Sequence, residues 1–325
     1  MSNTKATAVA HPNIAFIKYW GNREHALRLP SNPSLSMNMD GFTSTTTVEF
    51  DPALDKDVVM LGNNFITGPG RDRVSRMLDR VRQLAGMSVS AIVETRNNFP
   101  SGAGLASSAS GFAALAIAAS AAAGLHLSEA ELSRLARTGS GSACRSVPGG
   151  FVEWSMGADD QSSHAHSIAP AAHWDLRDVV AIIDISHKLV GSSEGHALAD
   201  SSPLQATRVA TAPERLTQAR SAVLARDFAA LAEVVELDSL MMHAVMMTSS
   251  PTLMYWQPAT IAVMQAVIQW RKVGLPACTT IDAGPNVHIL CPGEAVNDVV
   301  RRVQAIPGVR KILTAKPGGP ARLIG

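Results

Sequence analysis

The first candidate for chemistry is a carboxylate, Asp282, in residues 279–286, where a predicted strand breaks into a tight turn. Two segments rich in glycine and serine lie upstream of it. Phosphoryl transfer needs a carboxylate beside the accepting hydroxyl and backbone N–H groups around the phosphate oxygens. The chain offers both. The local sequence leaves one alternative open, in which Asp282 only accepts hydrogen bonds from its own turn.

The first glycine- and serine-rich segment, residues 100–110, follows a predicted strand at 89–94 and leads into an alanine-rich predicted helix at 112–125. It contains no Gly-Lys-Ser/Thr Walker motif. Ser107 and Ser108 fall on the first helical turn, where free N–H groups and the positive end of the helix dipole attract anions. We therefore interpret the segment as a phosphate site, with the alternative that both serines only cap the helix.

The second segment, residues 139–145, follows a short predicted helix that begins with a capping box at Ser128 and Glu131. It ends in Arg145, whose forked guanidinium can bind a carboxylate or a phosphate through two hydrogen bonds. Most arginines are solvated surface residues, so that alternative stays open. Lys18 ends a predicted strand among aromatic residues, a context more typical of a directed cation than of a surface lysine.

Periodicity and size predict an α+β chain with two lobes. The 325 residues, of which 46% are hydrophobic and 17% charged, exceed the length at which one core usually divides. We place the boundary near residue 178, so the predicted domains span 1–178 and 179–325. The predicted strands are residues 8–18, 36–50, 89–94 and 179–186, a pair flanking Asp282, and a last strand from 309. The predicted helices lie at 73–84, 112–125, 128–138, around 212–236, at 258–273 and at 295–305.

Charge and cysteine usage exclude some classes of function. The net charge is +1, so no long-range field draws the chain to nucleic acid or to acidic membranes. Three scattered cysteines, Cys144, Cys278 and Cys291, predict free thiols and a cytoplasmic location. The first residues lack the apolar core of a signal peptide, and the most apolar run is too short for a membrane span.

Five separated motifs follow one another along the chain. They read AHPNIA at 10–15 running into IKYWG at 17–21, NFP at 98–100 with GLASSA at 104–109, GSGSACRS at 139–146 with GGFVEW at 149–154, IAP at 168–170 before HW at 173–174, and DAGPN at 282–286. In these motifs the chain resembles the GHMP kinase superfamily and, within it, the mevalonate diphosphate decarboxylases and their phosphomevalonate relatives. The glycine loop alone would indicate only the superfamily, whereas the ordered set covers nearly the whole length.

The resemblance implies a two-lobed GHMP kinase fold of mixed and antiparallel sheets packed with helices, with an N-terminal ATP-binding domain and the active site between the lobes. It implies ATP and Mg²⁺ as cofactors and a mevalonate phosphate as substrate. ATP phosphorylates the tertiary 3-hydroxyl, the new phosphate leaves, and the carboxylate departs as CO₂. The residues expected at the nucleotide are Gly102, Gly104, Leu105, Ala106, Ser107 and Ser108, with Ser108 at the metal and Lys188 as a further candidate for the ATP phosphates.

The same resemblance gives roles to the remaining residues. Asp282 accepts or orients the hydroxyl proton, Arg145 holds the substrate carboxylate, and Lys18 balances charge near Asp282. The residues expected at the phosphate end of the substrate are Tyr19, Asn22, Ser140 and Ser142. No nucleic-acid or membrane partner is expected, and a homodimer stays open.

One departure from the family pattern bears on the substrate. Enzymes that take the diphosphate usually read Lys-Tyr-Trp-Gly-Lys, and here the second lysine position is Asn22. Many of them also carry an arginine close to the position of Gly195, and residues 189–207 contain none. A hydrogen bond to a charged group contributes ~1.5–3 kcal/mol. Two lost cations therefore favour 5-phosphomevalonate as the substrate, with isopentenyl phosphate as the product.

Other interpretations stay open. Arg23 could replace the missing lysine, which would make the chain a diphosphomevalonate decarboxylase that forms isopentenyl diphosphate. The superfamily also contains 3-kinases that stop before decarboxylation and sensors that bind ligand without turnover. The presence of both Asp282 and Arg145 argues against a sensor, because a binding module needs no proton acceptor.

Overall fold

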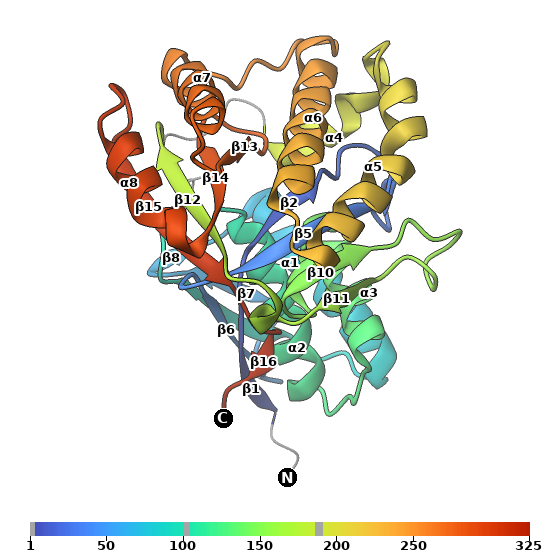
Figure 1. Ribbon diagram of the computed structural model, residues 1–325. Helices are drawn as coiled ribbons and strands as arrows, with labels where there is room; N and C mark the ends of the chain where they lie inside the picture. The colour runs from blue at the N-terminus through green and yellow to red at the C-terminus, as the bar shows by residue number, and fades with distance from the viewer. Residues whose placement is uncertain (1–3, 101–104, 186–190) are drawn as a thin grey trace.

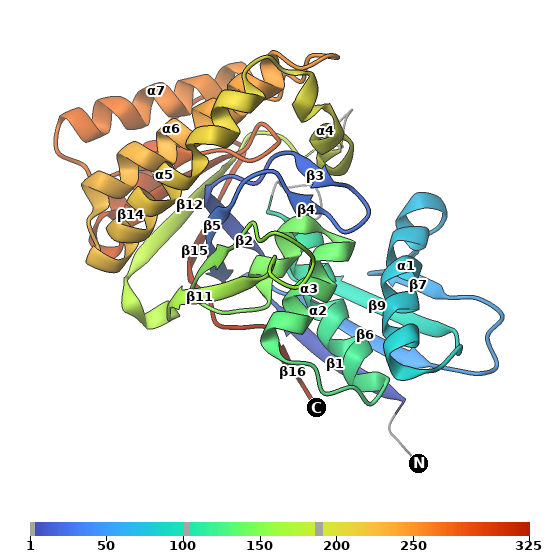
Figure 2. The same cartoon turned by 90° about the vertical axis from the view of Figure 1, so that its right-hand side faces the viewer.

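A six-stranded sheet forms one of the two layers that organise the chain in the computed structural model, which describes residues 4–100, 105–185 and 191–325 (Figure 1). Its strand order is β16-β1-β6-β9-β7-β8, and the neighbours are antiparallel except β7 and β9. Helices α1 (Gly68–Ala85), α2 (Ser107–Ala122) and α3 (Glu129–Gly139) lie on one side of it (Figure 2). The strands are β1 (Lys5–Ala10), β6 (Ser44–Phe50), β7 (Val58–Leu61), β8 (Asn64–Phe65), β9 (Ala91–Asn97) and β16 (Arg322–Leu323).

The second sheet is antiparallel in every pairing, with the order β11-β10-β5-β15-β12-β14-β13 and with β2 paired to β5 beside this path. Helices α5 (Gln205–Ala225) and α6 (Phe228–Met247) cover one face, and α7 (Pro258–Lys272) and α8 (Val296–Gln304) cover the other (Figure 1). The strands are β2 (Asn13–Ile17), β5 (Ser34–Asp40), β10 (Phe151–Trp154), β11 (Ala165–Ala169), β12 (Leu176–Ile182), β13 (Cys278–Thr280), β14 (Val287–Pro292) and β15 (Lys311–Pro317).

Strand β12 shows how this sheet is buried on both faces. Side chains alternate along a strand, so Val179 and Ala181 face one side while Val180 and Ile182 face the other. The first two join a core with α7 and α8, and the last two join a core with α5 and α6. Because both faces are covered, this strand is a continuous apolar run in the sequence rather than an alternating one.

The C-terminal part of the chain returns to strands from the N-terminal part. Strand β15 pairs with β12 and also with β5, where Pro317 lies opposite Met39. Strand β16 then pairs with β1 at the edge of the first sheet. The predicted domain boundary near residue 178 falls inside β12 and stays a prediction.

Two strands predicted as single elements are divided in the structure. The strand predicted at 8–18 is β1 and β2, which belong to different sheets. Pro12 lies between them and has no N–H to continue a ladder, so the chain changes sheets there. The segment predicted at 36–50 is β5 and β6, separated at Gly41, whose φ of 96° suits a glycine turn.

The helical stretch predicted around 212–236 is two helices. Arg226 ends α5 in the left-handed region, with φ 57°. Asp227 then caps α6, because its side chain accepts a hydrogen bond from the N–H of Ala230 at 3.0 Å. The prediction treated this pair of signals as helix interior and so missed the boundary.

The predictions on thiols and membrane spans can be compared with the structure. Cys144, Cys278 and Cys291 are all buried and free. None of the helices in the described ranges is long and apolar enough to cross a membrane. The cytoplasmic location and the homodimer stay predictions.

Candidate active site

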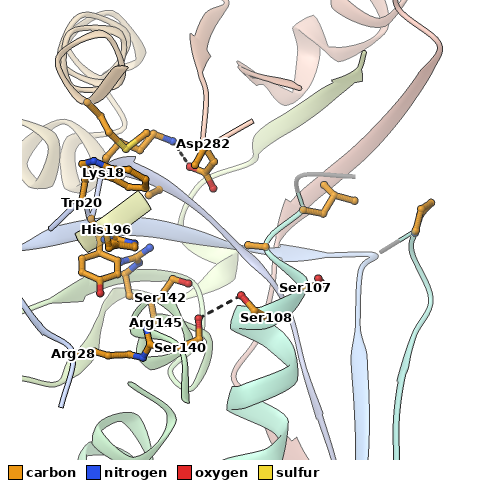
Figure 3. Close-up of a pocket in the computed structure, with 18 residues that line it drawn as sticks. Lys18, Trp20, Arg28, Ser107, Ser108, Ser140, Ser142, Arg145, His196 and Asp282 are labelled. Atoms are coloured by element: carbon orange, nitrogen blue, oxygen red, sulfur yellow. Dashed lines mark hydrogen bonds and ion pairs between the residues drawn. The ribbon is translucent and has the colours of Figure 1, made fainter. Parts of the chain in front are cut away.

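A cavity of about 220 Å³ opens where the N-terminus of α2, the 3-10 helix Gly141–Ser146, the end of β2 and the turn after β13 meet (Figure 3). It combines cations, hydroxyls and one carboxylate with apolar walls. The residues that line it are Ala15, Lys18, Tyr19, Trp20, Arg28, Pro100, Leu105, Ala106, Ser107, Ser108, Ser140, Gly141, Ser142, Arg145, His196, Met242, Asp282 and Ala283.

The structure places most of the predicted site residues in this cavity. Asp282, Lys18 and Arg145 lie in its wall, as do Tyr19, Ser140, Ser142, Leu105, Ala106, Ser107 and Ser108. Asn22 does not line the cavity, because it lies behind Tyr19 with 5% of its surface exposed. The predicted Gly102, Gly104 and Lys188 lie outside the described residues.

Lys18 and Asp282 form an ion pair at one side of the cavity (Figure 3). The ammonium Nζ lies 2.6 Å from Oδ1 of the carboxylate. The lysine side chain is 1% exposed and the aspartate side chain 33% exposed. The carboxylate is therefore the member of the pair that a ligand in the cavity can reach.

The charge state of Asp282 follows from competing effects. Burial raises the pKa of a carboxyl group, but here the ammonium of Lys18, with smaller contributions from His288 and Arg145, outweighs burial. The pKa of Asp282 is consequently lowered from its ordinary value of 3.8. Asp282 is an ionised hydrogen-bond acceptor throughout the neutral pH range.

A buried network holds the backbone of Lys18 from behind. Asp238 on α6 accepts a hydrogen bond from the backbone N–H of Lys18 at 2.6 Å and one from Nε of Arg215 at 2.7 Å. The carbonyl of Lys18 accepts from Nη2 of Arg208 at 2.7 Å and from Nδ2 of Asn32 at 2.9 Å. Because both backbone groups are bonded to buried side chains, the backbone from which the Lys18 side chain extends is fixed.

Arg145 is buried and held in one orientation. Oδ1 of Asn13 accepts hydrogen bonds from its Nε at 3.3 Å and its Nη2 at 3.2 Å, and Oγ of Ser34 accepts from Nη1 at 2.6 Å. The guanidinium also lies over the ring of Trp154, 5.9 Å from its centroid. A guanidinium has five N–H donors, so one donor on each Nη remains after these three bonds for a ligand on the cavity side.

The start of α2 provides an anion site. Ala106, the residue before the helix, has φ 47°, a left-handed conformation that is strained for a residue with a side chain. The first turn of the helix carries no acidic residue, and Ser107 and Ser108 open onto the cavity. Oγ of Ser108 lies 3.4 Å from Oγ of Ser140, so hydroxyls from two elements converge at this end (Figure 3).

These donors fit a nucleotide phosphate and its magnesium ion. Free helical N–H groups and hydroxyls suit phosphate oxygens, and Mg²⁺ takes oxygen ligands, many of them from phosphates and water. In the described ranges there is no cluster of three or more histidine, cysteine, aspartate or glutamate side chains that could hold a metal by itself. Ser108, the residue predicted at the metal, would share the ion with the phosphates.

Tyr19, beside Gly141 in the cavity wall, contacts neutral side chains. The Tyr19 hydroxyl donates a hydrogen bond to Oδ1 of Asn22, and the His196 ring stacks on Tyr19 with 4.1 Å between centroids. Nδ1 of His196 accepts from the N–H of Gly21 at 3.0 Å. Burial, with help from neighbouring arginines, lowers the pKa of His196 to about 3, so this imidazole is neutral near pH 7.

Sequence reasoning missed Arg28, His196, Trp20 and Met242. Arg28 lies between two leucines, and His196 follows the run GSSEG at 191–195, so neither belongs to a motif that would indicate a site. Arg23, which the sequence offered as a substitute cation, is exposed and donates to the carbonyl of Met156 at 3.2 Å. It does not line the cavity.

Two family models match the chain, the diphosphomevalonate decarboxylase-like N-terminal domain at residues 10–165 and the mevalonate 5-diphosphate decarboxylase C-terminal domain at 179–316. A phosphomevalonate decarboxylase from Haloferax volcanii is 37% identical and aligns over 98% of this chain and 98% of its own. A diphosphomevalonate decarboxylase from Ganoderma lucidum is also 37% identical, over 93% of this chain and 82% of its own. A solved structure described as MDDEF in complex with MVAPP, AMPPCP and magnesium superposes with a TM-score of 0.93, at 37% identity and 98% coverage of both chains.

Proposed function

The chain belongs to the diphosphomevalonate decarboxylase family, and we propose that within this family it converts (R)-5-phosphomevalonate to isopentenyl phosphate. Membership confirms the predicted two-lobed α+β fold of the GHMP kinase type. The chain is an ATP-dependent decarboxylase, and ATP and Mg²⁺ are its cofactors. The proposal concerns the residues that act on the substrate and the number of phosphates that the substrate carries.

ATP with Mg²⁺ supplies the phosphoryl group that turns the tertiary 3-hydroxyl into a leaving group. Asp282 accepts a hydrogen bond from that hydroxyl and orients its oxygen for attack. Its lowered pKa makes it a weak base, so full proton transfer follows late, when the hydroxyl oxygen has become acidic. Lys18 keeps the carboxylate ionised and adds positive charge beside the transferring group.

Arg145 holds the substrate carboxylate in this proposal. Its remaining Nη donors form the two parallel hydrogen bonds that a carboxylate accepts, and Asn13 and Ser34 keep the guanidinium plane in place. Fixing the carboxylate orients the bond that breaks when CO₂ departs. The start of α2, with Ser107 and Ser108, holds the nucleotide phosphates on the far side of the hydroxyl.

The observation that carries the monophosphate proposal is the neutral side chain at position 22. Asn22 is buried, and its carbonyl oxygen is occupied by the Tyr19 hydroxyl. The next cation along the chain, Arg23, turns outward to Met156. A second phosphate at this end would lose water without gaining a cation from position 22 or 23, and an ionised group desolvated without a partner is costly.

The alternative substrate is the 5-diphosphate. Equal identity to relatives named for each substrate supports neither over the other. The discriminating experiment is a panel of mevalonate, its 5-phosphate and its 5-diphosphate with ATP, in which ADP and CO₂ are measured together. We expect the 5-phosphate to give both products with the highest kcat/KM. A higher kcat/KM for the diphosphate would overturn the proposal, and ADP without CO₂ would point to a 3-kinase.

A further inference from the structure

Arg28 reaches the cavity from a small hairpin that contributes no other residue to the cavity wall among those described. The hairpin consists of β3 (Asn22–Glu24) and β4 (Leu29–Pro30). The Glu24 carboxylate closes the turn by accepting hydrogen bonds from the N–H groups of Ala26 at 2.8 Å and Leu27 at 2.6 Å. Arg28 follows with φ 53°, one of the few positive values at a non-glycine residue in the described ranges. Strained backbone of this kind clusters at ligand sites.

The hairpin is fastened to α3, which fixes where the Arg28 side chain lies. Nε of Arg137, a fully buried arginine, donates to the carbonyl of Leu27 at 2.9 Å. Nε of Arg28 itself donates to the carbonyl of Thr138 at 3.3 Å. The guanidinium is thus anchored through Nε, and the Arg28 side chain extends toward Ser140 (Figure 3). Among the described residues, no carboxylate lies within ion-pair distance of Arg28.

The surroundings of Arg28 are rich in donors and positive charge. Ser140, Ser142 and Tyr19 line the same part of the cavity. The charge of Arg28 contributes to lowering the pKa of His196 to about 3 and the pKa of Arg73 to about 10, after the larger effect of burial in each case. Among the described residues of the cavity wall, Asp282 is the only one with a carboxylate, and it is paired with Lys18. Positive groups held together without a matching anion form a site for an anionic ligand.

We propose that Arg28 is the specificity-determining cation of this site, and that its two Nη groups bind the phosphate ester of the substrate together with the hydroxyls of Ser140 and Ser142. The inference rests on the proposed function, because it assigns one arginine to one phosphate. It also explains how a chain with Asn22 in place of a lysine still recognises a phosphorylated substrate, because the charge is supplied from the turn of the same hairpin.

Two matched variants test this role. Arg28→Asn removes the charge with a residue that tolerates the left-handed conformation, and Arg23→Asn makes the same change at an exposed position of the same hairpin. The readout is the ratio of kcat/KM for 5-phosphomevalonate to kcat/KM for unphosphorylated mevalonate. We expect this ratio to fall by ~10- to 100-fold in Arg28→Asn, the range of a hydrogen bond to a charged group, with the KM for ATP unchanged. Arg23→Asn should leave the ratio within about two-fold, as is usual for exposed surface changes.

A charge-conserving variant separates the charge of Arg28 from its fork geometry. Arg28→Lys keeps the charge, and it should retain part of the ratio, because a single ammonium can bind a phosphate without the fork geometry. An unchanged ratio in Arg28→Asn, or in a folded Arg28→Gln if the first variant does not fold, would overturn the proposal. A higher kcat/KM of the unmodified protein for the diphosphate would overturn the proposed function but not the role of Arg28. That role would then be tested by the ratio of kcat/KM for the diphosphate to kcat/KM for mevalonate, which should fall in Arg28→Asn and would overturn the role if unchanged.

Discussion

Lys18 and Asp282 are 264 positions apart in the chain, yet Nζ of the lysine lies 2.6 Å from Oδ1 of the aspartate. The lysine is enclosed and the aspartate opens to the cavity. The pair therefore presents a carboxylate whose charge is held by a buried cation, which suits hydrogen bonding to a substrate hydroxyl.

Asp282→Asn keeps the shape of the side chain but removes the proton acceptor. We expect kcat to fall by ~10²–10⁴, the usual contribution of a general base, while the affinities for ATP and substrate stay within a few-fold. Single-turnover kinetics and calorimetric titration measure the two effects separately. The control is Asp175→Asn, at an exposed surface ion pair with Arg177. Near-normal turnover in Asp282→Asn would return this aspartate to a turn-forming role.

The pKa of Asp282 predicts how the site responds to acid. Burial would raise this pKa, but Lys18 outweighs burial and holds it below 3.8. A depressed pKa stabilises the fold above the unfolded value, and this contribution is lost as the pH falls through the folded value. Lys18→Met removes the main positive charge that counteracts the effect of burial, so the pKa of Asp282 should rise. Carboxyl ¹³C titration of both proteins checks this, and an unchanged or lower pKa in Lys18→Met would contradict it.

Asp238 positions Lys18 without touching the cavity. Its carboxylate accepts from the backbone of Lys18 and from Arg215, and it is fully buried. Asp238→Ala leaves a buried arginine without its anion, which should lower the free energy of unfolding by ~3–5 kcal/mol. Asp298→Ala, which breaks the exposed pair with Arg301, should change it by about 0.5 kcal/mol or less. Urea denaturation measures the free energy of unfolding of both variants. Equal decreases would show that the buried network around Asp238 stabilises the fold no more than an exposed ion pair does.

Local signals predicted some features of this fold and left others hidden. The capping box at Ser128 and Glu131 is confirmed. It could be predicted because both of its hydrogen bonds join residues only three positions apart. The roles of Asp238 and Arg28 depend on partners far away in the sequence. In the sequence Asp238 resembles a solvated helix residue, since helical periodicity does not reveal which polar side chain meets a distant backbone group.

The glycine-rich segment at 139–145 shows the same limit. The family resemblance placed Ser140 and Ser142 at the phosphate end of the substrate, and the structure gives a packing reason for the glycine between them. A Cβ on Gly141 would overlap the ring of Tyr19, so this glycine is required for the tyrosine to reach Asn22. Motif order could place the segment near the substrate, whereas only the tertiary contact explains the glycine.

Arg145→Lys should impair the enzyme although it conserves the charge. An ammonium has three donors on one atom, so it cannot bond Asn13 and Ser34 and also offer two parallel bonds to a carboxylate. We expect kcat/KM to fall by at least ~10-fold in a variant that remains folded, although loss of the buried bonds to Asn13 and Ser34 should lower its thermal midpoint. Arg310→Lys, at an exposed arginine, is the matched control. Full activity in Arg145→Lys would show that the guanidinium fork is not used by the substrate.

Asn22→Lys tests the choice between the two phosphate esters. In the unmodified protein we expect kcat/KM for 5-phosphomevalonate to exceed that for the 5-diphosphate by at least ~10-fold, a barrier difference of about 1.4 kcal/mol. The lysine would place a cation beside Tyr19 and release the tyrosine hydroxyl from its bond to Asn22, so a terminal phosphate would gain both a charge and a donor. The gap between the two esters should therefore narrow, mainly through faster use of the diphosphate. Steady-state kinetics with both esters measure it, and Asn22→Gln, which keeps the amide, should leave the gap as it was. If Asn22→Lys changes neither ester, position 22 plays no part in the selection, and the discrimination would have to come from elsewhere in the cavity wall.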